Sequence, residues 1–325
     1  IPWYFVKIVS RPEVFANSYL IITFLTLFWG LYAGTLIDRY SRKRLFVIIN
    51  IVCGILIGSI AFYGNYISSL PDFLVILVFG ITIFNYNVHY PNLYAFGQEI
   101  TERENYGKLN SYIEVQGQVT SVLAGAFAAI LLTGTKNNIL DIAGLTFVLP
   151  FNIEQWKIHE IFLLDAATYV AVIFIFMLMK YTPLVKEKIH TEGLFKRLKG
   201  GFMYLKSNPI IFVFGLASYM LFAFTLVEIH VVLPLYVKNF LQMDGNVFAS
   251  AEIYYSFGAI FSGLLILRLF KRFNTVIGVI VLMLIVSGAF YLMFKYKILW
   301  IFFLGNFLLG ITNAGVRILR TTYIF

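Results

Sequence analysis

Ionisable side chains inside long apolar runs are the residues of this sequence that can do chemistry. Glu228 lies well inside the run that begins at Pro209, with His230 two residues later, and Asp165 lies inside the run Ile161–Tyr181. A charge is costly in hydrocarbon, so such an acid is a candidate functional residue by default. We expect Glu228 and Asp165 to bind and release protons. The alternatives are a hydrated interfacial acid for Glu228 and a structural hydrogen bond for Asp165.

Polar residues also crowd one stretch of another apolar run. Asn85, His89 and Asn92 are spaced i, i+4 and i+7, so they share one face of a helix, and Pro91 predicts a kink there. This stripe predicts a polar wall of a substrate path, to which His230 also belongs; hydrogen bonding between helices is the alternative. His89 has no neighbouring metal-ligand pattern, and the sequence predicts no metal site and no cofactor.

The composition indicates that membrane-spanning helices position these residues. The 325-residue chain is 60% hydrophobic and 13% charged, with mean hydropathy +0.84, whereas soluble domains are about 45–50% apolar and about 25% charged. The sequence therefore predicts an all-α polytopic membrane protein. Its net charge of +9 fits loops facing an anionic leaflet rather than nucleic acid. The single Cys53 excludes a disulfide framework.

Apolar runs of about 20 residues predict nine complete spans. The residues before them, Ile1–Val9, read as the outer end of a preceding helix whose main part lies outside this chain, and Ser10–Asn17 as an outer loop. The stretch Gly134–Glu160 is too interrupted to span, so we expect an interfacial helix or a re-entrant loop. The predicted spans are Ser18–Ile37, Leu45–Tyr63, Phe73–Phe96, Leu109–Leu132, Ile161–Tyr181, Pro209–Val237, Ser250–Leu269, Val276–Phe294 and Leu299–Arg320.

A short basic turn joins the first two spans and sets the topology. Most of the 25 Lys and Arg residues then fall on the same side as this turn, which predicts that residues 38–44 and the basic linker 183–208 are cytoplasmic.

Part of the linker has helical apolar spacing and predicts an amphipathic helix on the membrane surface. Arg42 is expected to meet Glu99 or Glu102. The turn contains Gly34, Asp38, Arg39, Arg42 and Lys43.

The spacing of this turn recurs after the span Ser250–Leu269, without the Asp, at Gly263, Arg268, Lys271 and Arg272. Gly310-Ile311-Thr312 likewise repeats Gly80-Ile81-Thr82. Equivalent turns on either side of a basic linker predict two duplicated halves. We therefore divide the chain into an N-terminal bundle (1–182), the linker (183–208) and a C-terminal bundle (209–325).

The first turn resembles the signature loop between helices 2 and 3 of the major facilitator superfamily. The resemblance implies two six-helix bundles related by a pseudo-two-fold axis, with most of helix 1 and helices 11 and 12 absent from this chain, so that the second bundle is incomplete. It also implies a conformational gate at the turn, where Asp38 contacts the start of helix 11. The repeated turn is then the second-half gate.

Two further stretches resemble the drug-exporter branch that includes macrolide and enterobactin efflux proteins. They are residues 102–111 and 164–169. The span Leu109–Leu132 keeps Gly117 and Gly125 but lacks the branch's Pro. The resemblance implies proton-coupled efflux of hydrophobic small molecules by a rocker-switch mechanism. It implies as partners a small hydrophobic substrate, protons and the lipid bilayer of a bacterial inner membrane, with the protein as a monomer.

Two other functions are weighed against this one. A lysophospholipid or other lipid flippase can be built on the same fold, and the sequence does not separate it from an exporter. An intramembrane enzyme is the remote alternative, because the chain has no His-Glu-x-x-His, Gly-x-Ser-x-Gly or nucleotide-binding Gly-x-x-x-x-Gly-Lys motif. The missing nucleotide loop also argues against ATP-driven transport by this chain.

Overall fold

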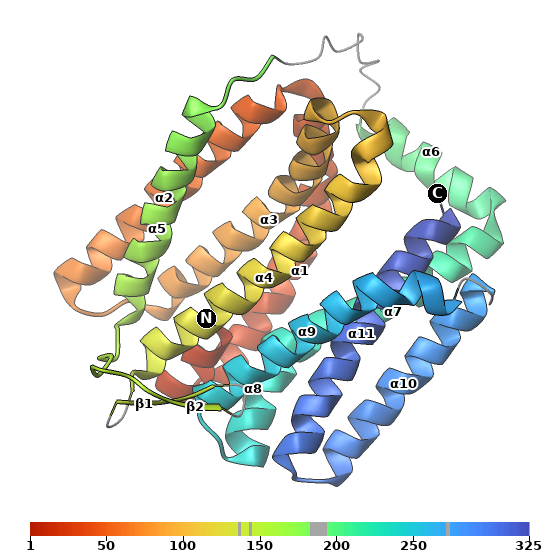
Figure 1. The fold of residues 1–325 in the computed structure, drawn as a ribbon. Helices are drawn as coiled ribbons and strands as arrows, with labels where there is room; N and C mark the ends of the chain where they lie inside the picture. Colours follow the sequence, from red (N-terminus) through yellow and green to blue (C-terminus); the bar gives the residue numbers. More distant parts are fainter. Residues whose placement is uncertain (136–137, 143–144, 183–193, 271–273, 325) are drawn as a thin grey trace. The chain divides into compact units, whose positions relative to one another are not determined.

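A computed structural model describes residues 1–135, 138–142, 145–182, 194–270 and 274–324 (Figure 1). In that part of the chain, nine helices are long and apolar enough to cross a membrane, as the hydropathy pattern predicts. The long helices are α1 (Pro12–Arg39), α2 (Arg42–Ile67), α3 (Asp72–Ile100), α4 (Tyr106–Thr133), α5 (Ile158–Leu178), α6 (Leu194–Ser207), α7 (Pro209–Val227), α9 (Gly245–Phe270), α10 (Thr275–Lys295) and α11 (Leu299–Ile324).

The predicted outer loop Ser10–Asn17 is wrong, because α1 already begins at Pro12. Proline at the first helical position has no amide hydrogen to leave unpaired, so it starts a helix well. The short π-helix η1 (Tyr4–Ile8) precedes this start. Arg11 Nη1 lies 2.9 Å from Asp72 Oδ2 at the start of α3, which places both turns at one end of the same helix group, as the alternating spans require.

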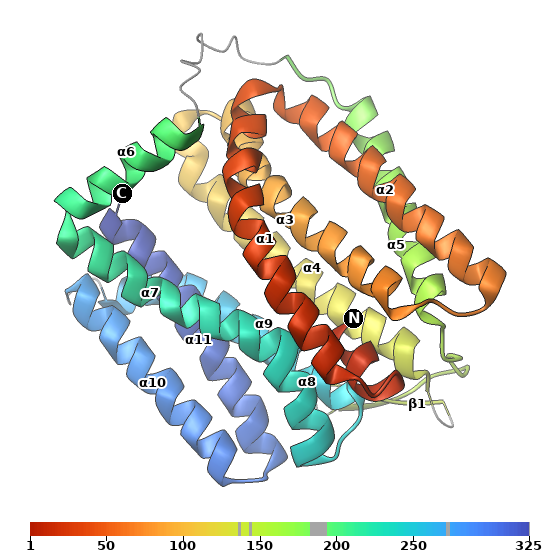
Figure 2. The ribbon, with the colours of Figure 1, turned by 180° about the vertical axis from the view of Figure 1, so that it is seen from behind.

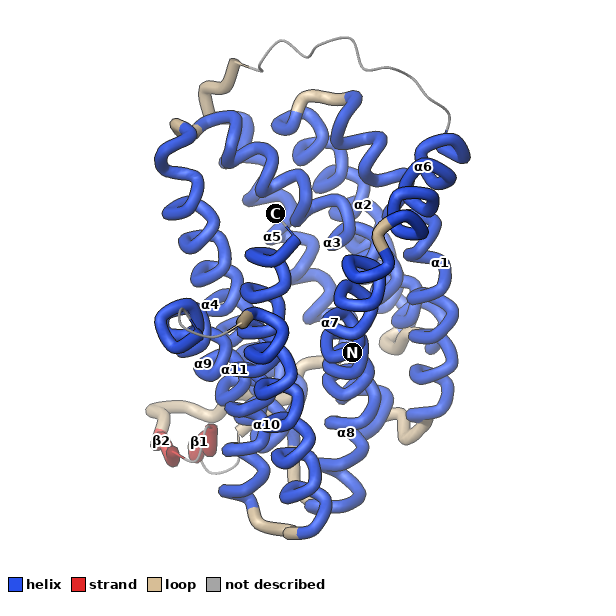
Figure 3. Tube along the Cα trace, turned by 90° about the vertical axis from the view of Figure 1, so that its right-hand side faces the viewer, coloured by secondary structure: helices blue, strands red, loops and turns tan. Residues whose placement is uncertain are grey.

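The stretch Gly134–Glu160 contains a β-hairpin instead of the expected interfacial helix or re-entrant loop. Strands β1 (Ile139–Ile142) and β2 (Leu145–Val148) pair antiparallel (Figure 3). The run from Ile139 to Val148 is rich in β-branched and large apolar residues, which favour extended backbone. β1 packs against α9.

The span predicted for Pro209–Val237 continues past Val237 and reaches Leu241. Beyond α7 its winding changes to a π-helix η3 (Glu228–Val232), a short α8 (Leu233–Leu235) and a second π-helix η4 (Tyr236–Leu241). Single-turn π segments of this kind are frequent at functional sites. Glu228 is the first residue of η3, so the change in winding begins at the acid singled out from the sequence.

The chain forms two compact units, each described here by itself. The first unit holds residues 3–113 and 156–192, and the second holds 114–155 and 193–325. In the first, α1 and α2 both pack on α3, and α2 packs closely on α5 (Figure 2). In the second, α9 and α10 both pack on α11. The contact-based units place residues 114–155 with the later helices, whereas duplication would group them with the earlier ones, and the predicted bundle boundaries remain a prediction.

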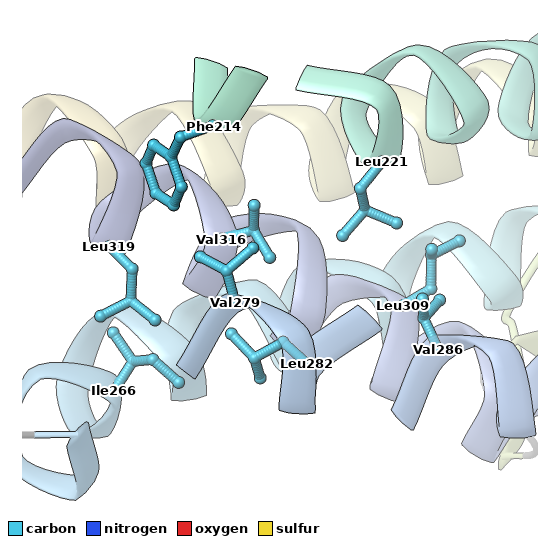
Figure 4. Close-up of a cluster of buried hydrophobic side chains, with 9 residues drawn as sticks. All are labelled: Phe214, Leu221, Ile266, Val279, Leu282, Val286, Leu309, Val316 and Leu319. Carbon is cyan, nitrogen blue, oxygen red and sulfur yellow. The ribbon is translucent and has the colours of Figure 1, made fainter. Parts of the chain in front are cut away.

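The contacts of the two units follow one order, in which the first and second helix of a group both pack on the third. This order is what the predicted duplication requires of α1–α3 and α9–α11. A buried apolar cluster joins four helices of the second unit (Figure 4). Its members are Phe214, Leu221, Ile266, Val279, Leu282, Val286, Leu309, Val316 and Leu319.

Candidate functional site

The basic turn of the first unit is only two residues long, because α1 ends at Arg39 and α2 begins at Arg42. Arg42 lies against the end of α3, where its Nε atom is 3.3 Å from Glu99 Oε1. The two side chains are 14% and 12% exposed, and Arg42 Nε has no hydrogen-bond partner in the described residues. The contact is therefore an ion pair, and it confirms Glu99 as one of the two partners expected for Arg42.

Residues at and just beyond the end of α5 contact this ion pair and the start of α2. The Tyr181 hydroxyl donates a hydrogen bond to Glu99, and Lys43 Nζ donates one to the backbone oxygen of Met179 at 2.6 Å. Burial, followed by the hydrogen bond and charge of Glu99, raises the pKa of Tyr181 to about 12. The start of α2, the end of α3 and the end of α5 are thus tied together at one end of the first unit.

The other predicted gate residues are described only in part. The Asp38 side chain lies outside the described residues, and Arg39 is exposed at the end of α1. A β-carbon added at Gly34 would meet no described atom within 4 Å. Glycine at this position is therefore not explained by close packing within the first unit.

The second-half gate is described only in part. Gly263 lies on α9 and, like Gly34, has no described atom within 4 Å of an added β-carbon. The Arg268 side chain and the residues Lys271 and Arg272 lie outside the described residues. The predicted equivalence of the two turns therefore stays a prediction.

The polar stripe of α3 faces its neighbours in the first unit. Asn85 Nδ2 donates to the Tyr169 hydroxyl on α5 at 3.3 Å, and Asn92, which is fully buried, donates to the backbone oxygen of Arg42 at 3.0 Å. The His89 ring lies edge-on against Phe46 on α2. These contacts favour hydrogen bonding between helices for Asn85 and Asn92, and the substrate-path role of the stripe stays a prediction.

Asp165 lies on the face of α5 that packs on α2. It is close enough to Cys53 and Tyr169 to interact with both electrostatically. The approach is close because Gly54 of α2 leaves room for the Tyr169 side chain, whose Cβ would lie 3.2 Å from an added β-carbon. Asp165, Tyr169 and Asn85 therefore form one half-buried polar group in the first unit.

Glu228 is the most deeply buried acid of the predicted set. Its side chain is 7% exposed, and its Oε2 atom has no hydrogen-bond partner among the described residues. This excludes the alternative of an acid exposed to water at the interface. His230 lies in the same π-helix, with Nδ1 2.8 Å from the backbone oxygen of Leu226. That contact is within its own helix and does not define a binding site.

A second acid, Glu252 on α9, lies beside Glu228 and was not among the candidates from the sequence. The two carboxylates interact electrostatically. Glu252 Oε2 also points at Gly125 on α4, where it lies 2.5 Å from the position an added β-carbon would take. The second unit thus brings together two half- to fully buried acids with a glycine backbone between α4 and α9.

Two buried carboxylates without a described cation are suited to hold a proton, because neutralising one of them removes both its desolvation cost and their mutual repulsion. Within the described residues, no three His, Cys, Asp or Glu side chains gather in a way that would hold a metal ion. A hollow of about 410 Å³ lies on α5, lined by Trp156, Glu160, Leu163, Leu164 and Ala167. It contains none of the predicted site residues.

The comparisons with known proteins agree with this architecture. The family model described as Major Facilitator Superfamily matches residues 9–325. Among solved structures, the chain is similar to a crystal structure of the nucleoside transporter NupG, with a TM-score of 0.61 and 15% sequence identity, over 99% of this chain and 76% of that one. At this identity the likeness shows the fold alone. None of the curated proteins compared with the chain matches it.

Proposed function

Because the chain belongs to the major facilitator superfamily, a family of membrane transporters, we propose that it is a secondary transporter that exports small hydrophobic molecules in exchange for protons. The observation that supports proton coupling is the buried Glu228 carboxyl beside Glu252 at the start of a π-helix. An acid with this burial is costly when charged, so its protonation and the state of the surrounding helices must be linked.

The proposed cycle uses the two parts of the protein differently. Glu228 takes up a proton in one conformation and releases it in the other, while the basic turn of the first unit governs which conformation is held. Asp38 belongs to this gate, as the superfamily resemblance implies. Asp38→Asn is then expected to slow transport and to leave substrate binding largely intact. An equal loss of substrate binding would count against a gating role.

Transport in proteoliposomes, with and without an imposed pH gradient, tests the proposal. The probes are a fluorescent lipophilic cation, a neutral macrolide, a fluorescent lysophospholipid and uridine. Uridine is included because the nucleoside transporter NupG has a similar fold. We expect a pH gradient to drive movement of the cation or the macrolide. Movement of the lysophospholipid alone would identify a flippase, and movement of uridine alone would replace the proposed substrate class.

The matched variants are Glu228→Gln and Glu13→Gln. Both remove one negative charge, but Glu13 is exposed in the first turn of α1. Glu228→Gln should abolish the response to the pH gradient and retain downhill exchange of substrate, because a glutamine cannot exchange a proton. Glu13→Gln should behave as the wild type. If Glu228→Gln keeps the full pH response, Glu228 is not the coupling residue.

A further inference from the structure

The helix α6 exposes a stripe that mixes cationic and large apolar side chains. Lys199, Phe202, Met203 and Lys206 are spaced i, i+3, i+4 and i+7, so they lie along one face. Phe202 and Met203 are 68% and 57% exposed, and both lysines are exposed. We call these four residues the α6 stripe. Two bulky apolar side chains between two lysines are unfavourable in water, so this face needs a partner.

The position of α6 restricts what that partner is. α6 ends at Ser207, and the next residue but one, Pro209, already begins the span that runs to Leu241. Asn208 Nδ2 donates to the backbone oxygen of Tyr204 at 2.9 Å, and α6 packs on α7. The last turn of α6 is therefore fixed to the end of a membrane span, at the level where lipid headgroups lie.

The charge of the helix restricts the partner further. The segment 194–207 contains four Lys or Arg residues and no Asp or Glu. It also contains the adjacent residues Gly200 and Gly201, which weaken an isolated helix, so the helix depends on what it packs against. A neutral or cationic surface would gain nothing from the lysines, whereas the headgroups of an anionic leaflet attract them.

We propose that the α6 stripe is a binding surface for anionic phospholipids. Phe202 and Met203 enter the boundary between headgroups and acyl chains, and Lys199 and Lys206 lie on either side of them against lipid phosphates. Lysine can reach such phosphates because its long apolar stem follows the helix surface while the ammonium group stays hydrated. This surface is independent of which molecule the protein transports and of what drives the transport.

The depth of the stripe in vesicles tests the proposal. A spin label is attached to full-length protein carrying Met203→Cys, with the buried Cys53 replaced by Ala. Its collision rates with oxygen and with a neutral nickel chelate report its depth. In vesicles containing one quarter phosphatidylglycerol, we expect the label at the acyl boundary. In pure phosphatidylcholine vesicles we expect it to be nearer to water.

Lys199→Gln combined with Lys206→Gln should remove this dependence on lipid charge, with the population bound to the surface falling about fivefold for each lysine. The control is Lys295→Gln combined with Lys297→Gln, which removes the same charge from the connection between α10 and α11 and should leave the depth unchanged. An equal depth in both lipids, or a lipid dependence that survives the loss of both lysines, overturns the proposal. Burial of the label only in native membranes, and not in vesicles, overturns it in favour of a protein partner.

Discussion

Gly258 of α9 lies directly against the backbone carbonyl of Phe307 on α11, so that a β-carbon added at Gly258 would overlap that carbonyl. The reverse contact also exists, because Gly310 of α11 lies against the carbonyl of Tyr255 on α9. The two helices therefore meet backbone to backbone, and the Asn313 amide adds a hydrogen bond to the Tyr255 hydroxyl at 2.6 Å. Small residues permit such an approach between membrane helices.

Gly258→Ala and Gly310→Ala should each lower the free energy of unfolding by about 2–3 kcal/mol, because the clash is with backbone atoms that cannot rotate away. Unfolding by denaturant in detergent micelles measures the loss. Gly215→Ala and Gly288→Ala are the controls, since no described atom lies within 4 Å of an added β-carbon at either position. They should be neutral or stabilising by up to about 1 kcal/mol. Equal effects at all four glycines would contradict the close contact.

Gly125→Ala should change the pH dependence of transport more than it changes stability. An added β-carbon would lie 2.5 Å from Glu252 Oε2, but the carboxylate ends a flexible side chain and can move. Moving the carboxylate changes its distance from Glu228, so Gly125→Ala and Glu252→Gln should each shift the pH profile. Transport measured over a pH series compares these variants with Gly288→Ala. An unchanged pH profile in both variants would show that the two carboxylates are not coupled.

The ion pair between Arg42 and Glu99 should show a coupling energy of about 1–3 kcal/mol in a double-mutant cycle of Arg42→Gln and Glu99→Gln. Both side chains are largely buried. Solvent and salt therefore screen the attraction between the two charges less than they would at an exposed surface. Arg42→Lys keeps the charge and should recover part of the loss. Additive effects of the two single substitutions would mean that the pair does not stabilise the turn.

Tyr181 should titrate about two pH units later than an ordinary tyrosine. Its pKa is raised from 10.0 to about 12 by burial and by its contact with Glu99. Because the pKa in the folded state is above that in the unfolded state, the stabilisation by this contact is present below pH 10. It is lost as the pH rises through 12. The absorbance of tyrosinate in wild type minus Tyr181→Phe measures the titration, and in Glu99→Gln the midpoint should move back toward 10.

The number of spans was predictable from the sequence because hydropathy over about 20 residues reports the thickness of the bilayer directly. Helix starts were less predictable, and this affected the site. The span predicted for Ser250–Leu269 places Glu252 in its first turn, where an acid is expected to be hydrated at the interface. In the structure α9 begins at Gly245, so Glu252 lies two turns into the helix, beside Glu228.

Side-chain partners were predictable only where charge and topology left few choices. Arg42 had two acids within reach, Glu99 and Glu102, and one of them is its partner. For the stripe of α3, periodicity gave the shared face but not what covers it, because helical spacing carries no information about the neighbouring helix. The contacts of Asn85 and Asn92 with α5 and α2 follow from packing alone. The same holds for the reciprocal glycine contacts between α9 and α11.

The wide winding that begins at Glu228 bears on how this protein can be aligned and engineered. A π-helical turn holds one residue more than an α-helical turn of the same height, which is the structural mark of a single-residue insertion. Removing one residue from 228–232 would restore regular winding. Because the wide turn already absorbs the extra residue, the helix beyond it would keep its present faces, and only the side chains within 228–232 would be reoriented.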